Sequence, residues 1–126
     1  MSDAITVLDN GRPISFTFDS INAYHGGGFP GGVAHALKAM QAAFPILSAT
    51  PMERREVTIV TAFSGPGGRD ALEMVTRAVT EGRLTVDKTI GGKDIITEPP
   101  GPYVFRFGYR GRTVEASIKP GHVKEE

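Results

Sequence analysis

Residues 25–44 read HGGGFPGGVAHALKAMQAAF, and this stretch decides how the chain folds around it. Five of its first eight residues are glycine, and neither a helix nor a strand persists through such a run. The apolar residues that follow recur every three or four positions, at Val33, Leu37, Met40 and Phe44. This spacing places them on one face of a helix. We therefore predict a loop over residues 25–32 and a helix over residues 33–44 that Pro45 ends.

A second glycine-rich segment, SGPGGRD at residues 64–70, follows a stretch with the composition of a buried strand. Residues 57–63 are uncharged and rich in β-branched side chains, which is typical of a central strand. Beyond the turn, one helical face carries Leu72, Val75 and Val79. The sequence predicts a strand over residues 57–63 and a helix over residues 70–81 that stops at Gly82.

The N-terminal part has the alternating pattern of a β-hairpin. Residues 5–8 and 14–18 flank an Asn-Gly pair at residues 10–11, which suits a type I′ turn. A short helix is expected next, with two candidate capping residues, Asp19 and Ser20.

The last third of the chain is also β-rich. Strand patterns cover residues 84–90, 103–109 and 113–119, and Arg110-Gly111 can turn the last two into a hairpin. The alternating aromatic side chains share one face, which we assign to a core or a dimer interface: Tyr103, Phe105, Phe107 and Tyr109. The fold class predicted is α+β: a helix–strand–helix core followed by antiparallel strands, in a mixed sheet with helices on one face.

The composition of the chain argues against several classes of function and partner. The 126 residues fit a single domain, residues 1–126. Fourteen basic and fourteen acidic residues give a formal net charge of zero, which argues against a nucleic-acid partner. The chain has no cysteine, so disulfides and thiolate metal sites are excluded. No signal peptide and no membrane-spanning stretch are visible, so we expect a cytoplasmic location and no membrane partner.

The two glycine-rich segments form the candidate site, because each one opens a predicted helix. Unpaired N–H groups at a helix N-terminus attract anions, and glycine lets a ligand approach the backbone. The alternative is that the glycines only turn the chain and that Asp70 caps its helix. Neither segment has a nucleotide-binding pattern. The predicted ligand-binding residues are Tyr24, Gly26, Gly27, Phe29, Ser64, Arg69 and Asp70.

His25 is the candidate catalytic residue because it adjoins the glycine run and imidazole titrates near neutral pH. The alternative is a histidine with a purely structural role. His35 and His122 are not spaced to form a local metal site with it.

The chain resembles the FmdE-like family of formylmethanofuran dehydrogenase proteins. The resemblance lies in residues 18–32, FDSINAYHGGGFPGG, in Ser64-Gly65, in residues 70–76, DALEMVT, and in residues 81–84, EGRL. It implies an α+β fold, a homodimer, and a pocket at the two glycine-rich segments. Members of the family bind a metal there through histidine and cysteine.

The departures from the family pattern concern the metal ligands. His25 keeps the first ligand position, whereas Gly27, Phe29 and Ser64 stand where the family has histidine or cysteine. The family's cysteine-rich zinc module has no counterpart in these 126 residues. No cofactor is therefore predicted, although a divalent metal at His25 stays an open alternative.

The sequence thus predicts a small cytoplasmic homodimer that binds a small anionic organic ligand between the two glycine-rich segments. Arg69 would supply positive charge to that ligand. The alternative is an enzyme that uses His25 as general acid or base, with little or no dependence on a metal.

Overall fold

The computed structural model describes residues 4–62, 65–90 and 104–117. Its helices are α1 (Phe18–His25), α2 (Pro30–Leu47), α3 (Pro66–Thr76) and the short 3-10 helix η1 (Arg54–Glu56). Its strands are β1 (Ala4–Asp9), β2 (Arg12–Thr17), β3 (Thr58–Thr61), β4 (Leu84–Val86), β5 (Val104–Tyr109) and β6 (Arg112–Ser117).

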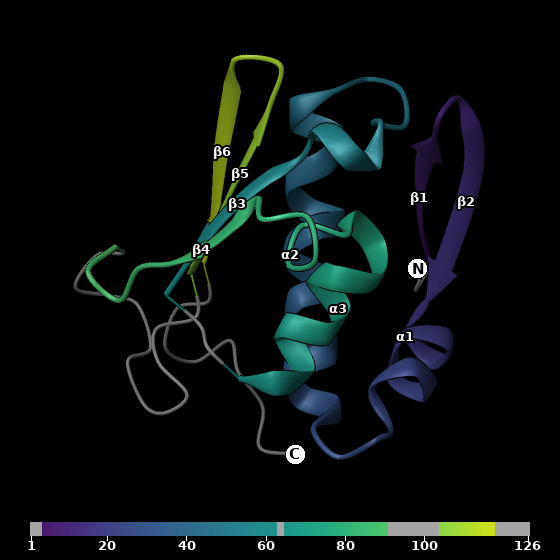
Figure 1. Cartoon of the computed structure of the whole chain (residues 1–126), viewed down its shortest axis with the longest axis vertical. Coiled ribbons are helices and arrows are strands. Elements are labelled where there is room, and N and C mark those ends of the chain that lie inside the picture. The colour runs from purple at the N-terminus through teal and green to yellow at the C-terminus, as the bar shows by residue number, and fades with distance from the viewer. Residues whose placement is uncertain (1–3, 63–64, 91–103, 118–126) are drawn as a thin grey trace.

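The strands form two separate sheets. The larger sheet has the order β4-β3-β5-β6, in which β3 runs parallel to β4 and antiparallel to β5. The smaller sheet is the β1–β2 hairpin. Figure 1 shows α2 and α3 between these two sheets, with α1 next to the hairpin. The predicted α+β class and the mixed sheet with helices on one face are confirmed, whereas a second sheet beyond the helices was not expected.

Both hairpins turn where the sequence predicts. Asn10 and Gly11 have φ angles of 53° and 83°, and Arg110 and Gly111 have φ angles of 49° and 84°. Two consecutive left-handed residues are the mark of a type I′ turn, whose twist matches that of the flanking strands. The turns therefore set the registers Asp9↔Arg12 and Tyr109↔Arg112.

The core extends from the larger sheet past α2 and α3 to the β1–β2 hairpin, whose inward-facing side chains belong to the same buried cluster. The predicted face of α2 is buried, and its Phe44 meets the ring of Phe107 edge-on at a centroid distance of 5.4 Å. Phe105, Phe107 and Tyr109 are all buried in this core. The aromatic face of β5 therefore belongs to the core and not to a dimer interface, and Tyr103 lies outside the described residues.

Helix α2 is longer than expected at both ends. It begins at Pro30 instead of Val33, since proline at the first helical position has the φ angle of a helix and no N–H group to leave unpaired. It passes through Pro45 and ends at Leu47. The prediction that Pro45 ends the helix is wrong, because in the last turn proline removes only one helical hydrogen bond.

Helix α3 overlaps the predicted range of residues 70–81, but it begins before residue 70 and ends before residue 81. Pro66 takes its first position, and Arg77, with φ of 60°, ends it. The carbonyls at its C-terminus accept hydrogen bonds from two arginines: Arg54 contacts Met74 and Val75, and Arg83 contacts Thr76. These tertiary contacts end the helix before Gly82, which lies in the following turn.

Helix α1 has a different cap from either residue proposed. Its N-cap is Thr17, whose hydroxyl accepts from the backbone N–H of Ser20 at 3.1 Å. The Ser20 hydroxyl in turn accepts from the backbone N–H of Thr17 at 2.9 Å. This reciprocal pair is a capping box, which satisfies two otherwise unpaired N–H groups.

Candidate functional site

The two glycine-rich segments meet in the folded chain. His25 ends α1 and Asp70 lies near the start of α3, 45 residues away, yet His25 Nδ1 lies 2.8 Å from Asp70 Oδ2. This contact joins α1 to α3 beside the N-terminus of α2. The structure thus places His25, Phe29, Arg69 and Asp70 in one region, which we call the helix junction, together with the first turns of α2 and α3.

Both ring nitrogens of His25 have hydrogen-bond partners. The backbone N–H of Phe29 donates to His25 Nε2 at 3.0 Å. The imidazole therefore accepts at Nε2 and carries its proton at Nδ1, which donates to Asp70. The His25 side chain is only 5% exposed. These two hydrogen bonds fix the orientation of the His25 ring and connect the end of α1 to the start of α2 and to α3.

The first turns of α2 and α3 touch through their backbones. A Cβ placed on Gly67 would lie 2.3 Å from the carbonyl oxygen of Phe29 and 3.1 Å from the nitrogen of Val33. A Cβ on Gly32 would lie 3.0 Å from the nitrogen of Gly68. Glycine is required at Gly67 because the opposing atoms are rigid backbone. The alternative reading of the glycines as structural residues is correct for these positions and for Gly26 and Gly27, whose φ angles of 94° and 78° turn the chain at the end of α1. Asp70, in contrast, does not cap α3, whose N-cap is Gly65.

Several N–H groups at the junction have no acceptor among the described residues. Neither α2 nor α3 has a side-chain cap or an acidic residue in its first turn. In the described part of the chain, the N–H groups without a helical partner belong to Gly31, Gly32, Gly67 and Gly68. Because two helix N-termini converge here, their partial positive charges add in one place.

The surroundings of the junction combine aromatic and charged side chains. Tyr24 and Phe29 are 54% and 56% exposed, which is unusual for large apolar residues in this structure. Arg69 is exposed in the first turns of α3, and the side chain of Asp70 is 39% exposed. Arg69 and Asp70 carry opposite charges, and they stand beside the partial positive charges of the α2 and α3 N-termini.

Two of the predicted ligand-binding glycines have another use. The N–H groups of Gly26 and Gly27 donate to the carbonyl oxygen of Asn22 at 3.0 and 3.1 Å, and thereby end α1. They are not available to a ligand in this arrangement. Gly31 and Gly32 are better placed, but the sequence pattern did not distinguish them because all five glycines lie in one run. Ser64 lies outside the described residues.

The described residues of the junction do not offer the ligand set of a metal ion. Zinc takes about four ligands, and both His25 nitrogens already have partners. Among residues 4–62, 65–90 and 104–117, no group of three or more histidine, cysteine, aspartate or glutamate side chains is arranged to hold one. We therefore assign no metal chemistry to these residues.

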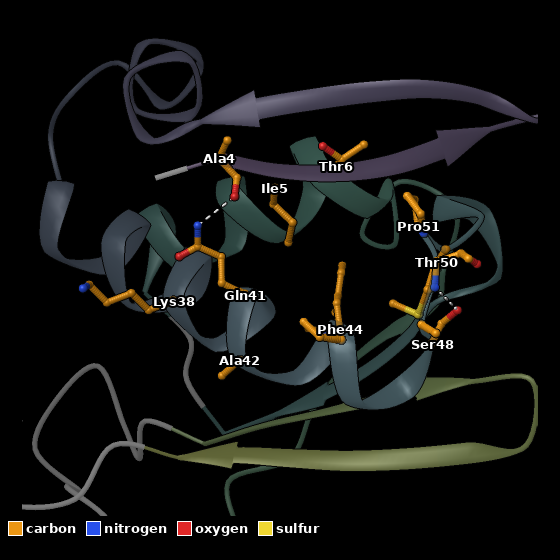
Figure 2. A pocket seen from close by; sticks show the side chains of 13 residues that line it. Ala4, Ile5, Thr6, Lys38, Gln41, Ala42, Phe44, Ser48, Thr50 and Pro51 are labelled. Atoms are coloured by element: carbon orange, nitrogen blue, oxygen red, sulfur yellow. Dashed lines mark hydrogen bonds between the residues drawn. The ribbon is translucent and has the colours of Figure 1, made fainter. Parts of the chain in front are cut away.

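A groove of about 700 Å³ lies elsewhere, between β1 and the C-terminal half of α2 (Figure 2). None of its lining residues belongs to the helix junction. Sequence reasoning missed it because its walls come from three separate segments, and only the fold brings them together. The volume is in the range of small-molecule sites, whereas the junction is a surface feature defined by charge.

Comparison of the chain with protein-family models, curated proteins and solved structures finds no match. The resemblance to the FmdE-like family thus stays a prediction. Among the described helices, none has both the length and the apolar character that crossing a membrane requires.

Proposed function

We propose that the protein binds a small organic anion at the helix junction. The observation that carries this proposal is the convergence of two helix N-termini with N–H groups that no described residue accepts. Gly31 and Gly32 are half-buried, so their N–H groups are the donors that a ligand can reach. Gly67 and Gly68 are buried and contribute to the positive field.

The exposed side chains around the junction define the class of ligand. Arg69 offers a guanidinium group to a carboxylate or phosphate. Tyr24 and Phe29 offer aromatic surface to the organic part of the molecule. A small aromatic carboxylate combines these features, and benzoate is the simplest probe.

A thermal-shift titration with benzoate and with inorganic phosphate tests the proposal. Binding to the folded state raises the melting temperature as ligand is added. We expect Arg69→Gln to weaken binding by about tenfold, since a hydrogen bond to a charged group contributes about 1.5 kcal/mol or more. Arg12→Gln is the control because Arg12 is an exposed arginine of the β1–β2 hairpin. No shift with either anion, or equal losses in both variants, would contradict the proposal.

The enzymatic alternative has less support. A general base needs a nitrogen free to take a proton, and Phe29 N–H occupies Nε2 of His25. His25 would act only after that hydrogen bond opened. The geometry favours a positioning role, in which His25 holds Phe29 and Asp70 at the edge of the site.

A cytoplasmic homodimer, with no nucleic-acid partner, completes the proposal. It rests on composition and on the family resemblance. Because β5 is in the core, the dimer interface would have to use another surface, such as the exposed edge of β6. Light scattering coupled to size-exclusion chromatography measures the mass directly, and a mass of one chain would remove the dimer from the proposal.

A further inference from the structure

The groove between β1 and α2 has an apolar floor. Figure 2 shows Ile5 on β1 and Phe44 on α2 pointing toward one another across it. Ala42 and Pro45 of α2 and Met52 of the following segment add further apolar surface. An open apolar groove beside a strand is suited to an extended ligand with an apolar side chain.

The outer edge of β1 offers one free backbone donor and acceptor to this groove. Leu8 N–H donates away from β2, to Met52 O at 2.8 Å, and Ala4 O accepts from Gln41 Nε2 at 2.8 Å. Backbone groups alternate in direction along a strand, so Thr6 N–H and C=O lie on the same side as those of Ala4 and Leu8. No described residue pairs with the backbone of Thr6 on that side.

The chain already uses this edge to bind an extended segment of its own. Leu8 forms a parallel bridge with Glu53, immediately beyond the segment that closes one end of the groove. The groove continues along the same edge from that bridge toward Ala4. An extended backbone therefore has one residue's length of unpaired strand edge available, centred on Thr6.

The other end of the groove carries a positive charge. Lys38 lines the groove, is exposed, and makes no ion pair with any described residue. Acidic side chains are absent from the described residues that line the groove. A ligand with a terminal carboxylate would meet a complementary charge there.

The geometry points to a second binding site, independent of the helix junction, for the carboxyl-terminal end of an extended peptide. One peptide residue would pair with Thr6 through two backbone hydrogen bonds. The side chain of that residue would share the exposed face of Thr6, so the apolar side chain of the next and last residue would lie over Ile5 and Phe44, and the terminal carboxylate would face Lys38. The partner is thus a peptide or protein tail with an apolar residue close to its free carboxyl end.

Fluorescence anisotropy with a labelled peptide tests this site directly. The probe is a tetrapeptide of sequence Ala-Ala-Ala-Leu, labelled at its amino end, with a free carboxylate. Two matched peptides carry a C-terminal amide or an N-methyl group on the third alanine, which pairs with Thr6. The amide removes the charge that faces Lys38, and the methyl group removes the N–H that would donate to Thr6. We expect each change to weaken binding by about fivefold to tenfold.

Variants of the protein locate the binding. Ala42→Phe fills the groove from an exposed helical position and is expected to weaken binding at least tenfold. Ala23→Phe, on the exposed face of α1, is the control and should leave binding unchanged. Lys38→Gln should abolish the preference for carboxylate over amide while the amide peptide still binds.

Two results would overturn the inference. One is peptide binding that Ala42→Phe does not alter, which would place the peptide elsewhere. The other is tight binding of decanoate with no binding of the peptide, which would make the groove a site for aliphatic acids. The binding of benzoate at the helix junction is measured separately, and its outcome does not affect either result.

Discussion

The helix junction and the β1–α2 groove differ in how they arise from the sequence. The junction comes from two conspicuous glycine-rich segments, and in the structure it is closely packed, with Gly67 against the backbone of Phe29. The groove is made from residues of ordinary composition, and it is open. The comparison teaches that glycines in this chain serve the backbone first: Gly32 and Gly67 let α2 and α3 approach each other, and Gly26 and Gly27 end α1. An open site, in contrast, arises from how separate segments pack.

The largest expected effect comes from breaking the contact at the junction. Gly67→Ala would place a methyl group 2.3 Å from the carbonyl oxygen of Phe29, and neither backbone can move without separating α2 from α3. We expect a loss of about 3 kcal/mol in the free energy of unfolding, at the upper end of the usual range for overpacking. Urea denaturation monitored by circular dichroism measures this loss.

Gly28→Ala is the matched control within the same glycine run. A Cβ at Gly28 has no atom within 4 Å, and its φ angle is not left-handed. Its effect should lie within about 0.5 kcal/mol of zero. If Gly28→Ala and Gly67→Ala destabilised the protein equally, the glycines would serve chain flexibility and not helix contact.

An intermediate effect is expected when the two hydrogen bonds of the His25 side chain are removed. His25→Ala leaves Asp70 and the N–H of Phe29 without their partner, and we expect a loss of about 2 kcal/mol. Asp70→Asn keeps an amide oxygen that can accept from Nδ1–H, so its loss should be less than half as large. Urea unfolding of both variants provides the comparison. An equal or larger loss for Asp70→Asn would show that the charge of Asp70, and not its hydrogen bond, maintains the contact with His25.

The smallest effect concerns a surface ion pair outside both regions. Arg110 donates two hydrogen bonds to the Glu56 carboxylate, at 2.8 and 2.9 Å, and these lower the pKa of Glu56 against a smaller opposing effect of desolvation. A lowered pKa stabilises the folded state above the pKa of the unfolded chain, about 4.3. That contribution disappears as the pH falls through the lower pKa of the folded state.

Arg110→Gln should therefore reduce the unfolding free energy slightly at pH 7 and leave it unchanged at a pH below the folded-state pKa of Glu56. Urea midpoints of the two proteins at several pH values, at low and at high salt, measure the difference. Salt should shrink it, because the pair is exposed. A difference that grew as the pH fell would have the wrong sign for this ion pair.

Much of the fold was predictable because local signals agree with the tertiary structure. The Asn10-Gly11 and Arg110-Gly111 turns indicated both hairpins, and the apolar spacing from Val33 to Phe44 indicated the buried face of α2. The end of α3 was not predictable, because Arg54 and Arg83 approach its carbonyls from other parts of the chain.

The candidate site was predictable only in part. The sequence hypothesis of a ligand between the two glycine-rich segments requires them to lie together, and the His25–Asp70 contact shows that they do. Which glycines keep an N–H group without a helical partner did not follow, because Gly26 and Gly27 have the same chemistry as Gly31 and Gly32 but end a helix instead of beginning one. The groove could not be predicted from the sequence, because it depends on how β1 packs on α2.

The most direct test of the central claim is a titration of the ¹⁵N-labelled protein with benzoate, followed by NMR of the glycine amides. We expect the Gly31 and Gly32 resonances to shift and to saturate together. Gly11, Gly82 and Gly111, which lie in turns away from the junction, should stay unchanged. Resonances at the junction that remain fixed while benzoate is added, or shifts confined to other residues, would contradict the assignment of an anion site to the paired helix N-termini.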